Sequence, residues 1–124
     1  IKQALGKLGK QAVEVSLFID PDKEQIGAAK KVGARMIELH TGRYANARNE
    51  KEQNKYFKEI EMATRYARDK DLAVCAGHGL NYHNVSRVAK IPDIEELNIG
   101  YSIICRAVLA GLERAVKEMK MLIG

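Results

Sequence analysis

The stretch "VEVSLFID", residues 13–20, decides the fold class because its side chains alternate between two kinds of surface. Its β-branched and aromatic residues favour a β-strand, in which successive side chains point to opposite faces. One face carries Val13, Val15, Leu17 and Ile19, and the other carries Glu14, Ser16, Phe18 and Asp20. The first face is suited to a packed core, whereas the second is partly polar.

The rest of the chain alternates predicted strands with predicted helices. Further strands are expected over residues 36–41, 72–77 and 96–100, and helices, from apolar residues at helical spacing, over 23–32, 51–69, 83–90 and 102–123. Residues 1–11 are amphipathic, and residues 42–50 are expected to form a loop. Strands and helices that alternate at this spacing imply a parallel sheet with right-handed crossovers.

The strand interiors favour one α/β architecture over another. In a doubly wound sheet, helices cover both faces and the central strands are apolar on both sides. Here Ile37 and Leu39 alternate with Glu38 and His40, and in the fourth strand Leu97 and Ile99 alternate with Asn98 and Gly100. A polar face toward the carboxyl ends of the strands is expected for the lumen of a (β/α)8 TIM barrel, where Phe18, Val74 and Ala76 are also expected. The sequence therefore predicts an α/β fold that forms part of such a barrel.

Composition narrows the class of partner. The chain has 124 residues, 46% hydrophobic and 30% charged, which is typical of one globular domain. It has no apolar run long enough to span a membrane and no signal peptide, so the cytoplasm is the expected compartment. The net charge of +5 suits an anionic partner, but the lysines are dispersed and tryptophan is absent, which favours phosphorylated small molecules over nucleic acid. Cys75 and Cys105, with no CxxC spacing, are expected to be reduced thiols in the core.

The stretch "VCAGHGLNYHN", residues 74–84, places a histidine between two glycines at the end of a predicted strand. Gly77 and Gly79 permit a sharp turn, and the imidazole of His78 can donate or accept a proton near neutral pH. A purely turn-capping role for His78 is the alternative. Tyr82 occupies the place of the third glycine of a dinucleotide-binding motif, so a nicotinamide cofactor is disfavoured.

The stretch "NIGYS", residues 98–102, supplies a second glycine after the fourth strand. Ser102 is a possible N-cap of the last helix. Loops after the last strands of a TIM barrel, together with a helix N-terminus, commonly bind phosphate. Gly79 and Gly100 are therefore candidate phosphate-binding positions.

Four stretches in this order, "VSLFIDPD", "IELHTGRYA", "AGHGLNYHNV" and "IPDIEELNIGYSII", resemble the C-terminal half of the pyridoxine 5′-phosphate synthase family. The resemblance implies a TIM barrel of which residues 1–124 form the C-terminal half, about the last four βα units of a single domain. It also implies condensation of 1-deoxy-D-xylulose 5-phosphate with 3-amino-2-oxopropyl phosphate to pyridoxine 5′-phosphate, phosphate and water. No metal or organic cofactor is implied, and the family assembles as oligomers of barrels.

The same resemblance implies roles for individual residues. His78 matches the family's proton donor, and Glu38 matches a strand-end carboxylate that stabilises the transition state. Gly79, Gly100 and Tyr101 match a backbone site for the aminoketone phosphate, although the family commonly has histidine where this chain has Tyr101. The family's other acid/base residues and its lid belong to the first half of the barrel.

Several readings of other residues remain open. His40 either orients Glu38 or takes part in the chemistry, whereas His83, which begins a predicted helix, is expected to be structural. Asp20 is expected to cap a helix. Arg43 and Arg48 either meet a phosphate or are solvated. A metal site built from the histidines and Cys75 is disfavoured because no two of them have ligand spacing on one face.

Two other functions are alternatives to the synthase. The first is a different phosphosugar enzyme on the same barrel, for instance a Schiff-base aldolase, which is disfavoured because it needs a lysine at a strand end and none is present there. The second alternative is a catalytically inactive half-barrel fragment that only binds phosphate or pairs with another half.

Overall fold

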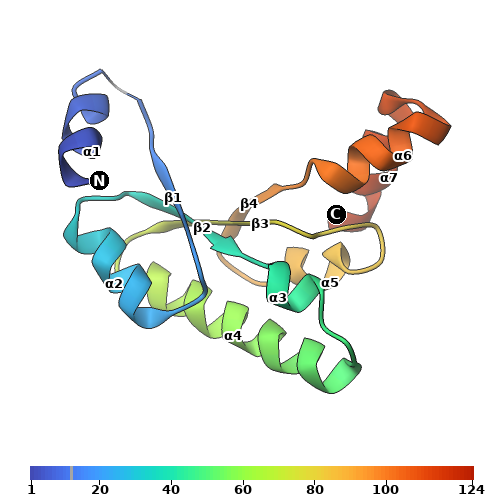
Figure 1. Cartoon of the computed structure of the whole chain (residues 1–124), viewed down its shortest axis with the longest axis horizontal. Coiled ribbons are helices and arrows are strands. Elements are labelled where there is room, and N and C mark those ends of the chain that lie inside the picture. Colours follow the sequence, from blue (N-terminus) through green and yellow to red (C-terminus); the bar gives the residue numbers. More distant parts are fainter. Residues whose placement is uncertain (12) are drawn as a thin grey trace.

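A four-stranded parallel sheet forms the centre of the computed structural model, which describes residues 1–11 and 13–124. Its strands lie in sequence order: β1 (Ser16–Ile19), β2 (Met36–His40), β3 (Ala73–Gly77) and β4 (Ile94–Asn98). The helices are α1 (Lys2–Gly9), α2 (Lys23–Lys31), α3 (Gly42–Ala45), α4 (Glu50–Arg68), α5 (Val85–Ala89), α6 (Tyr101–Ala110) and α7 (Leu112–Ile123) (Figure 1). The predicted α/β fold is confirmed, and the sheet is consistent with half of a (β/α)8 barrel.

The two faces of the sheet have different surroundings. Helices α2 and α4 lie along one face, below the strands in Figure 1, and contact β1, β2 and β3. The other face is open in the described part of the chain, and there the side chain of Phe18 is 55% exposed. We call this second surface the open face. The division of strand residues into a core face and a partly polar face is therefore confirmed for β1, β2 and β4, but β1 begins only at Ser16, and Val13, predicted on the core face, is exposed.

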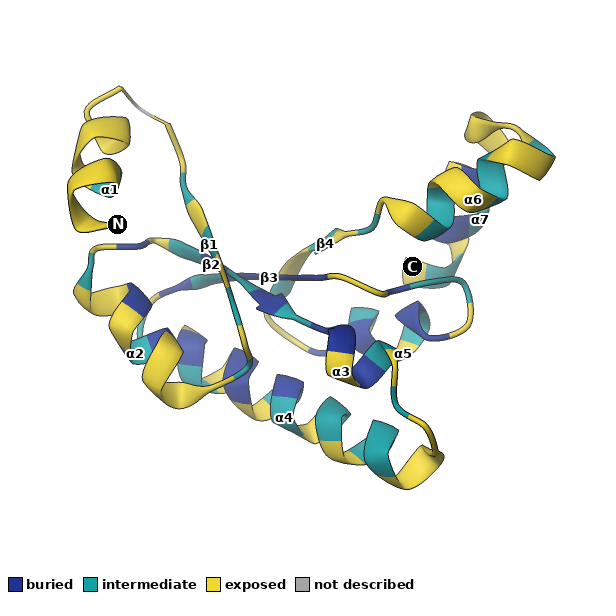
Figure 2. Cartoon of the chain, in the orientation of Figure 1, coloured by how far each residue is buried: buried dark blue, intermediate teal, exposed yellow. Residues whose placement is uncertain are grey.

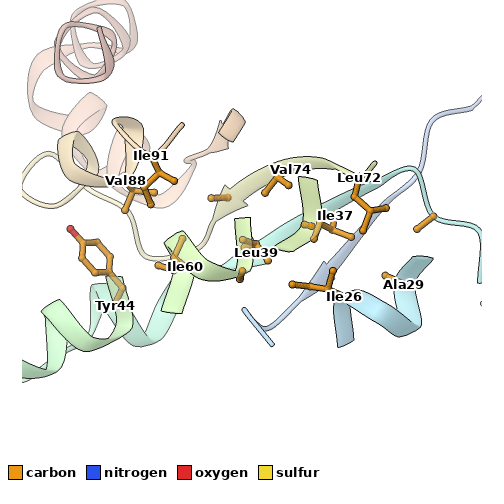
Figure 3. Packing of buried hydrophobic residues seen from close by; sticks show 14 of the residues in the cluster. Ile26, Ala29, Ile37, Leu39, Tyr44, Ile60, Leu72, Val74, Val88 and Ile91 are labelled. Carbon is orange, nitrogen blue, oxygen red and sulfur yellow. The ribbon is translucent and has the colours of Figure 1, made fainter. Parts of the chain in front are cut away.

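The hydrophobic core lies between the sheet and these helices (Figure 3). Ile37 and Leu39 of β2 pack there with Ile60 of α4, and β3 adds Val74 and Ala76. The expectation that Val74 and Ala76 face the lumen is wrong, because the parallel register pairs them with Ile37 and Leu39. The strand "AVCAG" contains no charged or strongly polar residue that could mark its faces, so alternation alone could not assign them.

The C-terminal helix predicted over residues 102–123 is two helices. Gly111 interrupts it with φ 81° and ψ 150°, a backbone conformation that glycine tolerates far better than other residues. Helices α6 and α7 then pack against each other, and Arg106 of α6 forms an ion pair with Glu118 of α7 at 2.7 Å. The apolar residues that were predicted to form one stripe therefore differ in their exposure. Ala115 and Met119 are buried, whereas Ile104, Val108 and Leu112 are exposed.

The segment predicted as a loop over residues 42–50 contains the short helix α3. Tyr44 of this helix is buried, and its hydroxyl donates a hydrogen bond of 2.8 Å to the carbonyl oxygen of Asn84. Burial raises the pKa of the Tyr44 hydroxyl. The loop is therefore anchored in the core, and it joins β2 to the segment that follows β3.

Two capping expectations are also wrong. Asp22, rather than Asp20, caps α2, because its side chain accepts hydrogen bonds from the N–H groups of Glu24 and Gln25. Gly100 occupies the N-cap position of α6, and the hydroxyl of Ser102 instead donates to the carbonyl oxygen of Leu80 at 2.9 Å.

His83 does not begin a helix, because α5 starts at Val85 and His83 lies exposed in the preceding turn. Across the described residues, no helix combines the length and apolar character that crossing a bilayer requires.

Candidate active site

A cleft of about 1050 Å³ lies where the carboxyl ends of the strands meet the start of α6. Five predicted site residues line it, namely Glu38, His78, Gly79, Gly100 and Tyr101. Parallel strands bring their carboxyl ends to one edge of the sheet, which explains why residues so far apart in sequence meet there. In Figure 1 the chain passes from β4 directly into the orange helix α6.

Glu38 is held on the open face by a partner from β4. Its Oε2 atom accepts a hydrogen bond of 2.9 Å from the side-chain amide of Asn98. Gly77 of β3 lies between them, and a Cβ atom there would overlap Oε1 of Glu38 and approach the Cβ and carbonyl oxygen of Asn98 to 3.0 Å. The carboxylate can reach Asn98 only because the intervening residue has no side chain.

An irregularity in β4 sets the position of Asn98. The register between β3 and β4 shifts between Val74 and Cys75, so that Val74 pairs with Ile94 while Cys75 pairs with Glu96. One extra residue in β4, a β-bulge, then aligns Gly77 with Asn98. The sequence placed Asn98 on the polar face, but nothing in it predicted this shift or the bond to Glu38.

His78 follows the last residue of β3 and has a left-handed backbone, with φ 77°. Strand alternation alone would direct the side chain after Gly77 toward the core. Its imidazole instead lies against that of His40, with ring centroids 4.7 Å apart, and 6.3 Å from the ring of Phe18. His78 is exposed, so its ring is accessible from the cleft.

Thr41, which the sequence did not indicate, supports the backbone of this turn. Its N–H group donates to the carbonyl oxygen of Gly77 at 2.8 Å. Its hydroxyl oxygen lies 2.7 Å from the carbonyl oxygens of both Gly77 and His78. The side chain is fully buried, and its contact with the carbonyl of Gly77 is shielded from water, whereas that with the carbonyl of the exposed His78 is partly buried. A threonine after a polar strand residue is the only sequence signal that could have drawn attention to it.

His40 does not form the predicted hydrogen bond to Glu38, and its alternative role in the chemistry stays a prediction. Its Nδ1 atom lies 3.2 Å from Oδ1 of Asp20 at the end of β1, and the ring of Phe18 meets its edge at 5.0 Å. The hydrogen-bonding expectation is wrong because Glu38 turns to Asn98 across β3, whereas His40 turns to Asp20 on the other side. His40 therefore borders the ring of His78 without touching Glu38 through a hydrogen bond.

The opposite wall of the cleft has backbone N–H groups available to an anion. Gly79 has φ 82°, and within the described residues its N–H group donates to no other atom. The first N–H groups of α6, from Gly100 onward, have no partner inside the helix. A Cβ atom at Gly79 would come within 2.7 Å of the Cβ of Ala45, so only glycine fits there. This wall can bind a phosphate group through N–H donors and the helix dipole.

The arginines near this region are engaged by other residues. Arg106 lines the cleft, but its guanidinium holds Glu118 at 2.7 and 3.0 Å. Arg43 lies over the ring of Tyr56, 4.3 Å from its centroid, and neither Arg43 nor Arg48 lines the cleft. The alternative that these two loop arginines meet a phosphate in the cleft therefore gains no support.

The two cysteines differ in their surroundings. Cys75 is buried beneath the open face, where burial, followed by the charges of Glu96 and Glu38, raises the pKa of its thiol. The expectation of a core thiol is confirmed for Cys75 but wrong for Cys105, which is exposed and lines the cleft. Within residues 1–11 and 13–124, no three His, Cys, Asp or Glu side chains gather closely enough to ligate a metal ion.

This chain matches one protein family and several curated proteins over all or nearly all of its length. The family model described as "Pyridoxal phosphate biosynthesis protein PdxJ" matches residues 1–124. A curated pyridoxine 5′-phosphate synthase of Coxiella burnetii (strain RSA 493 / Nine Mile phase I) is 56% identical over 124 residues, covering 100% of this chain and 52% of the relative. The corresponding enzyme of Magnetococcus marinus is 50% identical over 122 residues, covering 98% of this chain and 50% of the relative. The chain thus spans about half the length of the curated relatives it matches.

Proposed function

Since the chain belongs to the PdxJ family of pyridoxal phosphate biosynthesis proteins, we propose that it supplies part of the active site of a pyridoxine 5′-phosphate synthase. The relatives that carry this name are about twice as long, so the proposal concerns the protein in which this chain is joined to, or closed by, the other half of the barrel. The reaction is the condensation of 1-deoxy-D-xylulose 5-phosphate with 3-amino-2-oxopropyl phosphate, which releases phosphate and water.

One observation carries the proposal: an imidazole, a carboxylate and an anion-binding wall line the same cleft. Ring closure between an amine and a ketone requires proton transfers and passes through cationic intermediates. His78, exposed to the cleft, is the proton donor or acceptor in this proposal. Glu38, fixed by Asn98, stabilises developing positive charge.

The phosphate of the aminoketone is assigned to the wall formed by Gly79 and the start of α6. The N–H groups of Gly79, Gly100 and Tyr101 are the donors, and the positive end of the dipole of α6 favours the dianion. Tyr101 serves through its backbone in this assignment. Its side chain is almost fully exposed, so it is free to move aside or to cover the phosphate.

The test is turnover of both substrates by the complete protein, followed by release of inorganic phosphate and formation of pyridoxine 5′-phosphate. We expect His78→Asn, which keeps hydrogen bonding but cannot transfer the proton, to lower kcat by about 10²- to 10⁴-fold. Glu38→Gln removes the negative charge and should also lower kcat. Glu113→Gln, which changes an exposed ion pair on α7, is the control and should leave turnover unchanged.

Turnover by His78→Asn at the wild-type rate would reduce His78 to a residue of the turn. A substrate complex of the complete protein with both phosphates away from Gly79 and Gly100 would refute the phosphate assignment.

A further inference from the structure

The backbone of His78 is in a conformation that a side chain of this size adopts at a cost. Among the described non-glycine residues, only Asp71, His78 and Asp93 have positive φ, which is uncommon outside glycine even for aspartate and histidine, two of the residue types that adopt it most often. Strained backbone of this kind persists only where its surroundings hold it, and it is enriched at functional sites. A neighbouring residue must therefore hold the backbone of His78 in this conformation.

Thr41 makes the contacts that hold this backbone. Three short approaches join this one residue to the two peptide groups at the turn: its N–H to the carbonyl of Gly77, and its hydroxyl to the carbonyls of Gly77 and His78. The hydroxyl has one proton, which either carbonyl can accept. Losing this hydroxyl would leave the carbonyl oxygen of His78 without its donor from Thr41, whereas the carbonyl of Gly77 would keep the N–H of Thr41.

The residues on either side of Thr41 meet the ring of His78. The ring of His40 lies against it at an interplanar angle of 60°, with centroids 4.7 Å apart. A Cβ atom at Gly42 would lie 2.7 Å from Nε2 of His40 and 3.2 Å from Cδ2 of His78. Residues 40–42 therefore bound both the backbone and the imidazole of His78.

We infer that Thr41 is a positioning residue for His78: its hydroxyl and N–H fix the left-handed turn that keeps the imidazole against His40 and exposed to the cleft that Glu38 also lines. The inference rests on the proposed function in so far as that function gives His78 its proton-transfer role. Thr41 itself does not line the cleft and has no part in the proton transfer.

The first test compares Thr41→Val with Thr41→Ser in the complete protein. Valine keeps the shape of threonine without the hydroxyl, so we expect kcat to fall by about 10²-fold, because misplacing a reacting group by an ångström has an effect of that size. The KM values should change much less than kcat. Serine restores the hydroxyl and should restore most of kcat.

Thr64 provides a matched control. It is also buried, and its hydroxyl donates to a backbone carbonyl, that of Ile60, at 2.9 Å within α4. Thr64→Val therefore removes the same kind of bond away from the cleft. It should lower the melting temperature while leaving kcat near the wild-type value, which separates loss of stability from loss of positioning.

A second readout does not depend on turnover. The ring resonances of His78 in a ¹³C–¹H spectrum of histidine-labelled protein should shift in Thr41→Val and stay in place in Thr41→Ser and Thr64→Val. If Thr41→Val does not fold, Thr41→Ala and Thr41→Ser form the comparison, since they differ by one oxygen atom.

Unshifted His78 resonances, together with a kcat for Thr41→Val equal to that of Thr64→Val, would overturn the inference. Absence of turnover in the wild-type protein would refute the proposed function instead, and the resonances would still decide the role of Thr41.

Discussion

Gly77 shows how much of the site depends on a single missing side chain. It separates Glu38 on β2 from Asn98 on β4, and the hydrogen bond between those two residues passes over it. Every side chain larger than hydrogen would occupy the space of the Glu38 carboxylate. The glycine is therefore required by packing, although its own backbone is that of an ordinary strand.

Replacing Gly77 with alanine should displace the carboxylate of Glu38 from Asn98. We expect a loss of stability of about 1–3 kcal/mol from overpacking, because the obstructing atoms include the backbone carbonyl of Asn98. The synthase activity of the complete protein should fall as well. Thermal unfolding and kcat/KM measure the two effects.

Gly27→Ala is the control for this substitution. Gly27 lies in α2, where an added Cβ atom meets nothing within 4 Å. Alanine is favoured over glycine inside a helix, so this variant should gain about 0.5–1 kcal/mol. Equal stability of the two variants would contradict the account of Gly77.

At the residue scale, the sequence predicted the open-face positions of Glu38, His40 and Asn98 because each alternates with apolar neighbours. It could not predict their partners. Whether His40 meets Asp20 or Glu38 depends on distances across strands, which alternation does not contain. The support that Thr41 gives to His78 likewise joins residues 37 positions apart.

The pair α6–α7 is the element that the sequence predicted least well. Apolar residues continue at helical spacing through Val108, Leu112 and Ala115, so periodicity indicated one helix. The break depends on the backbone of Gly111, and glycine within a helical pattern is often tolerated. Helices α2 and α4, whose apolar stripes are not interrupted, were predicted to within about two residues.

Glu118 joins the two helices and makes their association depend on pH. Hydrogen bonds from Arg106 and then Arg114 lower the pKa of its carboxyl from 4.5 to about 2. Because the carboxyl has a lower pKa in the folded protein than in the unfolded chain, its contribution to stability is present above about pH 4.5. That contribution is lost as the pH falls toward about 2.

We therefore expect Glu118→Gln to have a lower melting temperature than the wild type at about pH 6, with the difference shrinking as the pH falls to about 2. Thermal unfolding followed by circular dichroism measures it. Glu113→Gln, which removes an exposed pair with Lys117 on the same helix, should have a smaller effect. A difference that stays constant across this pH range would contradict the role of Glu118.

For the whole molecule, the surfaces left uncovered are as informative as the core. β1 and β4 are edge strands with unpaired backbone groups, and the open face has no covering layer within the described residues. Figure 2 shows α6 in the colours of exposed and intermediate residues, with none buried, and Val108 and Leu109 on it are 81% and 84% exposed. A barrel of this class takes about 250 residues, about twice the length of this chain.

An isolated polypeptide of these 124 residues should therefore not be a stable monomer. We expect it to associate, with itself or with the complementary half, and to have no synthase activity, because one half supplies only part of the active site. Size-exclusion chromatography with light scattering measures the association. A monomer that unfolds cooperatively would contradict the prediction, and turnover by such a monomer would also exclude the need for a second half.

The strand order β1-β2-β3-β4 has a consequence for synthesis of the chain on the ribosome. Each strand pairs with the one that emerges immediately before it, so the sheet can grow at one edge during translation without waiting for a distant segment. The entropy lost at each addition is that of closing a single βα unit. The cleft, in contrast, is lined both by Phe18 of β1 and by Tyr101 of α6. It is therefore complete only after α6 has left the ribosomal exit tunnel.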